Sequence, residues 1–271
     1  ALTSEILGEA RDDEGTSVRV GRLEGGAADS LARRLADAWV LIADGHHRYE
    51  SALAYREKRR VEGRDDAGTL LVYLCSLEDP GLRIFPIHRL VHSLPSFDAA
   101  RLRGLLAGMF SLTRIDDPGA LRAALAARRG RAGVFGLALK GEAGFLLAEW
   151  REGAGLDRPE MASIPKSLRA LDVVLLHRLI IEGMLGISAE ALARQTHLDY
   201  VKDDREWLGR LRQDSVDLGI LMNATRIEQV IEVTRSGSRL PQKSTYFYPK
   251  VPSGLVLDPL DPRSPSKARG G

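Results

Sequence analysis

The sequence predicts an α/β protein with a mixed sheet, and three observations support this prediction. An apolar run of strand length occupies residues 39–43 and stops at Asp44. From Tyr49 to Tyr55 apolar residues then recur at intervals of three and four, the pattern of an amphipathic helix. A second apolar run follows at residues 69–77. Strand, turn, helix and strand in this order predict a right-handed crossover in a partly parallel sheet.

Composition narrows the class of protein. The chain has 271 residues, enough for one large domain or two lobes, and its 44% hydrophobic and 28% charged residues are typical of a globular protein. No apolar stretch is long enough to cross a membrane, and the first residues lack a signal-peptide layout, so we expect a cytoplasmic protein without membrane contact. A net charge of only +2, without a block of like charges, argues against nucleic-acid binding.

The single cysteine, Cys75, excludes an internal disulfide and any metal site built from several cysteines. It lies inside the apolar run 69–77, which predicts a small buried core residue there.

The remaining elements predict three domains and a tail. Residues 1–95 form the first domain: a hairpin around residues 12–15, a helix over 27–38, the strand–turn–helix unit, and a strand at 82–87. A small α/β lobe is predicted at 96–152, with helices at 98–110 and 118–129 and hairpin strands at 134–139 and 144–150. A carboxyl-terminal α/β unit is predicted at 165–257, with helices at 168–185, 188–194, 203–214 and 226–234 and strands at 197–201 and 218–222. Residues 258–271 are predicted to be a flexible tail.

The turn Asp44-Gly45-His46-His47-Arg48 is the first candidate site. Gly45 permits a sharp turn and a close approach by another group, and the first amides of the following helix have no intrahelical acceptor, so the turn can bind phosphate. Arg48 offers a fork of donors, and the two histidines can donate to an anion or move protons near neutral pH. Asp44 can hold a sugar hydroxyl, a divalent ion or a histidine. The alternative is that Asp44 caps the helix beside surface histidines.

A second group of polar residues, His88 and Arg89, follows the predicted strand 82–87. If this strand neighbours the one at 39–43, these two side chains form a second wall of the site. The alternative is that His88 and His92 pack on one face of a short helix. The sequence evidence for a zinc site built from these histidines is weaker still, because the His-Glu-x-x-His pattern is absent. His177, in the apolar helix 168–185, is predicted to be a core residue and not a ligand.

Lys243, Ser244 and Thr245 place one cation and two hydroxyls in three residues after a proline. This grouping can bind a phosphate, although the glycine framework of a P-loop is absent. The aromatic residues 246–248 that follow can stack on a base or form an alternating strand on the core.

Four stretches of the chain resemble one protein family. They are Ala43-Asp44-Gly45-His46-His47-Arg48 through residue 56, Leu82-Arg83-Ile84-Phe85-Pro86-Ile87-His88-Arg89-Leu90, Leu171-Asp172-Val173 through His177, and Pro241-Gln242-Lys243-Ser244-Thr245-Tyr246-Phe247-Tyr248-Pro249-Lys250. In sequence and order they match family 1015 of bacterial and archaeal domains of unknown function, and the chain is identified as a member. Family members usually have a longer amino-terminal region, so the chain is expected to start inside the family pattern.

The Gly-His-His-Arg turn is also similar to the phosphate-binding turn of the ParB and sulfiredoxin superfamily, whose members bind nucleotides and include free-serine kinases. The resemblance implies a ParB/sulfiredoxin-like core in residues 1–95. It also implies binding of ATP, or another nucleotide, with magnesium. Sulfiredoxins have a catalytic cysteine where this chain has His46, which argues against sulfiredoxin chemistry.

The functional hypothesis is a nucleotide-binding protein, and more specifically an ATP-dependent kinase of a small hydroxylated metabolite such as free serine. Asp44, His46 and His47 would act in catalysis, while Gly45, Arg48, Lys243, Ser244 and Thr245 would bind phosphates. One alternative is a non-catalytic, nucleotide-controlled binding or regulatory protein similar to ParB. Another is a metal-dependent phosphohydrolase that uses His46 and Asp44. The sequence sets neither the acceptor nor the oligomeric state.

Overall fold

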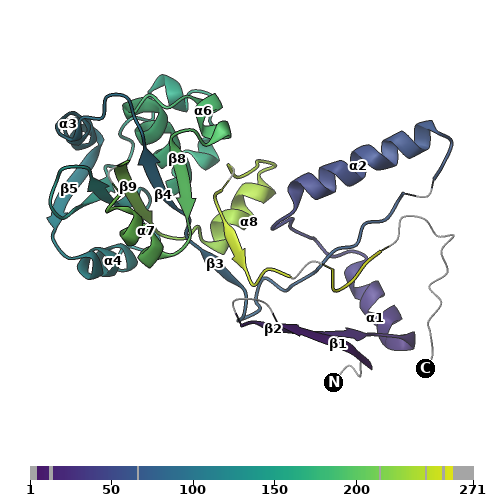
Figure 1. The fold of residues 1–271 in the computed structure, drawn as a ribbon. Helices are drawn as coiled ribbons and strands as arrows, with labels where there is room; N and C mark the ends of the chain where they lie inside the picture. The colour runs from purple at the N-terminus through teal and green to yellow at the C-terminus, as the bar shows by residue number, and fades with distance from the viewer. Residues whose placement is uncertain are drawn as a thin grey trace. The chain divides into compact units, whose positions relative to one another are not determined.

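The structure is a computed structural model that describes residues 5–11, 15–65, 67–213, 215–241, 243–251 and 254–258. The chain divides into two compact units (Figure 1). Unit 1 comprises residues 1–83 and 247–271, and unit 2 comprises residues 84–246. Each unit is described by itself below.

Unit 2 is built on a six-stranded sheet in which every recorded strand pair is antiparallel. The strand order is β5-β7-β6-β9-β4-β8, and β9 is buried along its whole length between β6 and β4. The strands are β4 (His88–His92), β5 (Phe110–Ile115), β6 (Val134–Leu139), β7 (Phe145–Trp150), β8 (Leu198–Val201) and β9 (Val216–Met222).

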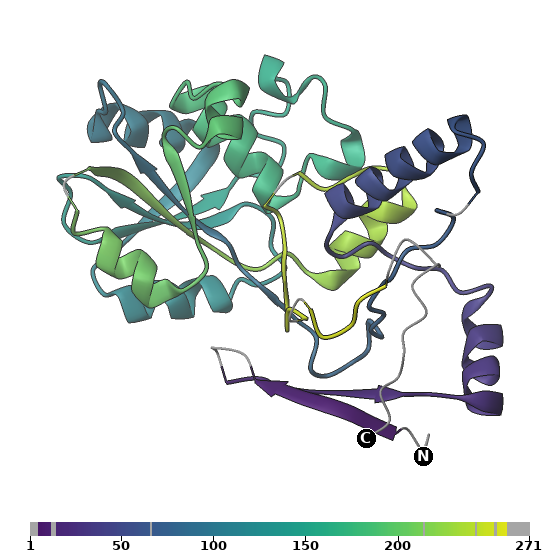
Figure 2. The ribbon, with the colours of Figure 1, turned by 45° about the vertical axis from the view of Figure 1, so that its right-hand side comes forward.

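Each face of this sheet has its own hydrophobic cluster. On the first face Val91, Ile220 and their neighbours pack against α3 (Ala99–Met109), α5 (Asp172–Leu175) and the π-helix η3 (Leu176–Met184). On the second face Leu90 and Leu221 pack with α4 (Pro118–Ala126) and α7 (Asp204–Arg210). Figures 1 and 2 show α4 and α7 on the same side of the sheet, with α3 on the other side. Because side chains alternate along a strand, neighbouring residues of β4 enter different clusters.

Side-chain caps begin several of the helices of unit 2. Asp98 accepts a hydrogen bond from the Arg101 amide at the start of α3, and Asp117 accepts one from the Ala120 amide at the start of α4. Asp203 accepts from two amides at the start of α7. Caps of this kind satisfy amides that have no intrahelical partner, which explains where these helices begin. The other helical elements are η1 (Pro159–Met161), η2 (Lys166–Leu168), α6 (Ala189–Arg194) and α8 (Ile227–Arg235).

Unit 1 contains a two-stranded antiparallel ribbon of β1 (Glu5–Arg11) and β2 (Ser17–Arg22), followed by α1 (Gly25–Leu35) and α2 (His46–Val61). The Thr16 and Tyr248 hydroxyls, 2.7 Å apart, join this ribbon to the carboxyl-terminal segment. Strands β3 (Arg83–Phe85) and β10 (Tyr246–Tyr248) form a separate two-stranded sheet, and the division between the units falls within these two strands. Among the described residues of unit 1, Phe247 is the only buried one.

The predicted α/β class is confirmed, as are most helices and strands of unit 2. The hairpin at the start of the chain is also confirmed, although residues 12–14 of its expected turn lie outside the described residues. Strand β5 was not predicted, because it follows α3 without an interruption. The expected lobe at 96–152 and the expected unit at 165–257 differ from the observed organisation, since strands from both share the single sheet of unit 2.

Two predicted buried strands are wrong. Residues 39–43 and 69–77 form no strand, and most of their apolar residues are exposed, with 62% exposure at Val40 and 65% at Tyr73. No described strand pairs with either segment, so the backbone has no ladder and the expected parallel crossover is absent. Cys75, predicted to be buried, is exposed for the same reason.

No helix in the part of the chain that the structure describes combines the length and the apolar character needed to cross a bilayer.

We expect amide hydrogen exchange to separate these segments from the core. Amides of residues 40–43 and 70–74 should exchange close to the rate of an unfolded chain, because they lack strand partners among the described residues, whereas β9 should be strongly protected. Mass spectrometry of exchanged peptides measures both in one sample. Protection of residues 70–74 comparable to that of β9 would contradict this description.

Candidate functional site

The turn before α2 has the geometry of a tight glycine turn. Gly45 is the N-cap residue and has a left-handed backbone, with φ of 82° and ψ of 26°, which glycine adopts without strain. An added Cβ at Gly45 would lie 3.0 Å from Nε and Nη2 of Arg48. The guanidinium of Arg48 therefore folds back against the turn, and a larger residue at position 45 would push it away.

The amino end of α2 is open for an anion. The first backbone bond of the helix runs from the Tyr49 amide to the Gly45 carbonyl at 3.0 Å, and no side chain caps the helix in the described structure. The amides of His46, His47 and Arg48 precede this bond and so have no acceptor within the helix. The alternative that Asp44 caps α2 does not hold, because its carboxylate accepts from the Gly45 amide at 2.8 Å instead.

Asp44 is held by a residue far away in the sequence. Its Oδ2 lies 2.7 Å from Nζ of Lys250, which belongs to the same unit. Burial raises the pKa of Asp44, but the hydrogen bond and charge of Lys250, the Gly45 amide and the charge of Arg48 together lower it below its usual value. Asp44 is therefore a carboxylate at neutral pH. Because both side chains are partly exposed, the pair contributes little to stability, and its main effect is on local charge.

His46 and His47 are exposed beside the same turn. The Nδ1 of His47 lies 3.4 Å from a carboxylate oxygen of Glu50, one turn further along α2. The structure thus brings together five of the residues predicted to form the site, Asp44 to Arg48, on a surface that solvent reaches.

His88 belongs to unit 2, where its ring is buried. The Met222 amide donates to Nδ1 of His88 at 3.3 Å, and Nε2 lies 2.7 Å from Oδ1 of Asp204. This pattern places the ring proton on Nε2, which donates to the carboxylate. Both ring nitrogens therefore form hydrogen bonds within unit 2, one to β9 and one to α7, which makes His88 a structural residue in this unit.

Arg89, the next residue of β4, is also buried but lies on the opposite face of the sheet. Its guanidinium donates to the Ile87 carbonyl and, at 2.9 Å, to the Lys243 carbonyl, and it lies 5.0 Å from the centre of the Tyr200 ring. Burial lowers the pKa of Arg89 to about 10, which still leaves the side chain charged at neutral pH.

Lys243, Ser244 and Thr245 also lie in unit 2, and the Lys243 carbonyl accepts a hydrogen bond from Arg89. The buried Ser244 hydroxyl donates to the Pro241 carbonyl, and the Ser244 carbonyl accepts from the Thr225 hydroxyl at 2.8 Å. Ser244 is thus used internally. Lys243 is exposed, with its amine 5.9 Å from the Tyr200 ring centre.

One residue was missed by sequence reasoning. Lys250 binds Asp44 but was not among the predicted site residues, although it lies in a stretch that matches the family pattern, which was the available signal. His177 was predicted to be a core residue. The Nε2 of His177 is buried and has no hydrogen-bond partner among the described residues. Burial, together with the charges of Arg89 and Arg178, lowers the pKa of His177 to about 3.

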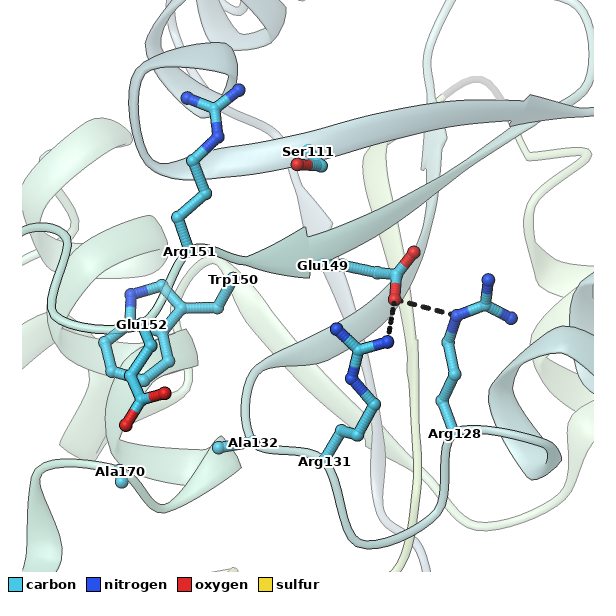
Figure 3. A pocket seen from close by; sticks show the side chains of 9 residues that line it. All are labelled: Ser111, Arg128, Arg131, Ala132, Glu149, Trp150, Arg151, Glu152 and Ala170. Carbon is cyan, nitrogen blue, oxygen red and sulfur yellow. Dashed lines mark hydrogen bonds and ion pairs between the residues drawn. The ribbon is translucent and has the colours of Figure 1, made fainter.

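An open pocket of about 690 Å³ lies elsewhere in unit 2 and contains none of the predicted site residues (Figure 3). Nε of Arg128 and Nη1 of Arg131 lie 2.8 and 3.0 Å from one oxygen of Glu149. The Glu149 carboxylate offsets one of the two positive charges and joins β7 to the segment after α4. None of the predicted site residues lines this pocket, so it is not the candidate site. Nor do three potential metal ligands gather anywhere in the described residues.

Comparison with known proteins identifies the family. The model described as "Protein of unknown function (DUF1015)" matches residues 3–174. The chain belongs to this family. A comparison with curated proteins finds no match for this family member.

Solved structures provide low-level matches. The chain is similar to a free serine kinase variant in complex with AMP, at 17% identity and a TM-score of 0.37, over 76% of this chain and 66% of the kinase chain. It therefore spans just under two thirds of the kinase's length. It is also similar to a conserved hypothetical protein from Pyrococcus furiosus, at 15% identity and a TM-score of 0.40, over 76% of this chain and 68% of that one.

We expect His177 and Asp172 to affect stability with opposite pH dependence. Burial raises the pKa of Asp172 to about 6, although the Gly133 amide and Arg226 oppose this. Between pH 3 and 6.5 the unfolded chain binds more protons at His177 than the folded one, so this residue costs stability as pH falls through about 6.5. Asp172 binds more protons in the folded state between about pH 4 and 6, so its contribution improves as pH falls.

Denaturant unfolding at pH 7 and pH 4.5 tests this prediction. Relative to the wild type, His177→Leu should gain about 2–3 kcal/mol in the free energy of unfolding on going from pH 7 to 4.5. At pH 4.5 the imidazole of the unfolded wild type is protonated and must lose its proton on folding, a cost that the variant does not have. Asp172→Asn should lose relative stability over the same change. Equal pH dependence of the wild type and His177→Leu would show that His177 titrates normally.

Proposed function

We propose that the turn Asp44–Arg48 binds the phosphates of a nucleotide, and that the protein is an ATP-dependent kinase of a small hydroxylated metabolite, with free serine as the first acceptor to test. The observation that supports this most directly is the uncapped amino end of α2, where the Arg48 guanidinium lies against the left-handed Gly45.

This turn offers donors of the type that phosphate oxygens require. The three amides at the start of α2 and the guanidinium of Arg48 lie at the positive end of a helix of 16 residues. A carboxylate beside such a site would repel phosphate, but Lys250 offsets the charge of Asp44. With Arg48, the turn carries a net positive charge before the histidines are considered.

Each residue then has a role that follows from its position. Arg48 and the helix amides hold phosphate oxygens, while the exposed His46 and His47 stabilise charge on the transferred group. Asp44 interacts with the acceptor hydroxyl or with magnesium. One carboxylate suits magnesium bound to a nucleotide, because phosphates and waters usually supply its other ligands, and the ion would neutralise phosphate charge. Asp44 would exchange its contact with Lys250 for either partner.

The proposed reaction is a single transfer. The bond between the γ-phosphorus and its bridging oxygen breaks, a bond to the acceptor oxygen forms, and the products are ADP, a phosphate ester and a proton. Such transfer depends mainly on positioning and electrostatic stabilisation, which is what the residues of this turn supply. The choice of nucleotide comes from the similarity of the turn to the ParB and sulfiredoxin superfamily. The family itself has no assigned function.

Calorimetric titration with ATP and magnesium, and with ADP, tests the binding part. Arg48→Ala should weaken binding by about 1.5–3 kcal/mol, roughly 10- to 150-fold, because a charge-assisted contact to phosphate is lost. Arg56→Ala is the matched control, since it removes an exposed arginine of the same helix about 12 Å from the turn.

Equal losses in Arg48→Ala and Arg56→Ala would show a general effect of charge and contradict binding at the turn. If the folded wild type binds neither nucleotide, the proposed function is wrong.

An acceptor assay tests the kinase part. With ATP and magnesium, ADP should form at a rate that depends on added serine, and phosphoserine should accumulate in equal amount. Glycine serves as the control because it lacks the hydroxyl. Nucleotide binding without any serine-dependent ADP would contradict the assignment of serine as the acceptor, and ADP release without any acceptor would instead show hydrolysis.

A further inference from the structure

Arg89 is a buried cation without a matching anion in unit 2. Its side chain is 1% exposed, and no carboxylate among the described residues lies within 4.0 Å of its nitrogens. Two backbone carbonyls and, at 3.5 Å, the sulfur of Met222 accept its hydrogen bonds. These groups are neutral, so the charge itself stays uncompensated in the protein interior, which is an unfavourable arrangement.

One edge of this guanidinium remains available. The Nε atom of Arg89 is buried and has no hydrogen-bond partner among the described residues, and Nη2 has a second proton beyond the one donated to Lys243. Nε and Nη2 form the side of a guanidinium that donates two parallel hydrogen bonds to a carboxylate or a phosphate.

His177 supplies a second unpartnered nitrogen on the same side of the sheet as Arg89. Arg89 lies on the sheet face that carries Val91, and the helical segment 172–184, which contains His177, packs over that face. The Nε2 of His177 is buried and also has no hydrogen-bond partner in the described structure. The charge of Arg89 contributes to the lowered pKa of His177, which agrees with this placement.

Lys243 brings a second positive charge to the same place. Tyr200 stands directly opposite Arg89 across the β4–β8 pair. The carbon centre of the Arg89 guanidinium lies 5.0 Å from the Tyr200 ring centre, and the Lys243 amine lies 5.9 Å from it. The ring attracts both cations, but they repel each other. Lys243 itself is exposed, so its positive charge lies at the surface beside the buried Arg89.

We propose that Arg89, His177 and Lys243 form a binding site for an oxyanion, the carboxylate or phosphate group of a small molecule. The anion accepts from Nε and Nη2 of Arg89 and from Nε2 of His177, and it separates the charges of Arg89 and Lys243. A buried water would satisfy the unpartnered donors but would leave both charges uncompensated. The site lies within unit 2 and does not depend on the nucleotide proposed for the turn in unit 1.

The test uses the full chain carrying Arg48→Ala, so that an anion at the amino end of α2 does not contribute. Sodium phosphate and sodium acetate are titrated separately against sodium chloride at constant ionic strength, up to about 50 mM, while thermal unfolding and the ¹⁵N shift of the Arg89 Nε are followed. One or both anions should raise the melting temperature saturably and move the Arg89 signal. The more effective anion identifies the phosphate or the carboxylate as the preferred group.

Two variants and a control make the result specific. In the same background, His177→Leu and Lys243→Met should each weaken the apparent anion affinity at least tenfold. His177→Leu should also melt no lower than its parent without anion, because it removes an unsatisfied buried nitrogen. Lys166→Met, which removes an exposed lysine elsewhere in unit 2, should leave the response unchanged.

His177→Leu is the deciding variant, because Arg89 donates to two backbone carbonyls and its removal would disturb the fold itself. The proposal is overturned if neither anion gives a saturable response, or if His177→Leu responds as Lys166→Met does. A response that is lost only in Lys243→Met would also overturn it, since that pattern shows surface charge without a buried site. These outcomes are independent of nucleotide binding at Arg48.

Discussion

Burial of polar side chains on β4 is the constraint on which much of unit 2 depends. A strand between two others can carry His88 and Arg89 inward only if most of their hydrogen-bonding groups find partners, since each unsatisfied buried group costs about 1–3 kcal/mol. The partners come from distant segments: Asp204 from α7, the Met222 amide from β9 and the Lys243 carbonyl. Two consecutive residues thereby fix both faces of the sheet and the segment that leads to β10.

Elements whose causes are local could be predicted from the sequence. Helices α3, α4 and α7 begin beside Asp98, Asp117 and Asp203, whose caps act over two or three residues. The hairpin of β6 and β7 is equally local. Residues 39–43 and 69–77 were misassigned because an apolar run indicates burial only when a partner exists, and no described strand pairs with them.

The candidate site follows the same division. Gly45 and the open start of α2 are properties of five consecutive residues, so the sequence identified them. The contact of Lys250 with Asp44 and the unpartnered nitrogens of Arg89 and His177 arise from tertiary structure, and spacing along the chain does not encode them. His88 is an error in the opposite direction, because it was predicted to be a site residue from its place after a strand. Both of its ring nitrogens form hydrogen bonds inside unit 2.

The ion pair between Asp44 and Lys250 joins residues 206 positions apart, and this separation has a consequence for protein synthesis. The turn is synthesised before Lys250, and the lysine that offsets the charge of Asp44 is added about 10–40 s later at ordinary rates of elongation. During that interval the carboxylate stands beside the open helix end without its counter-ion. The charge around the turn in a nascent chain therefore differs from that in the finished protein, because Asp44 lacks its counter-ion until Lys250 has been added.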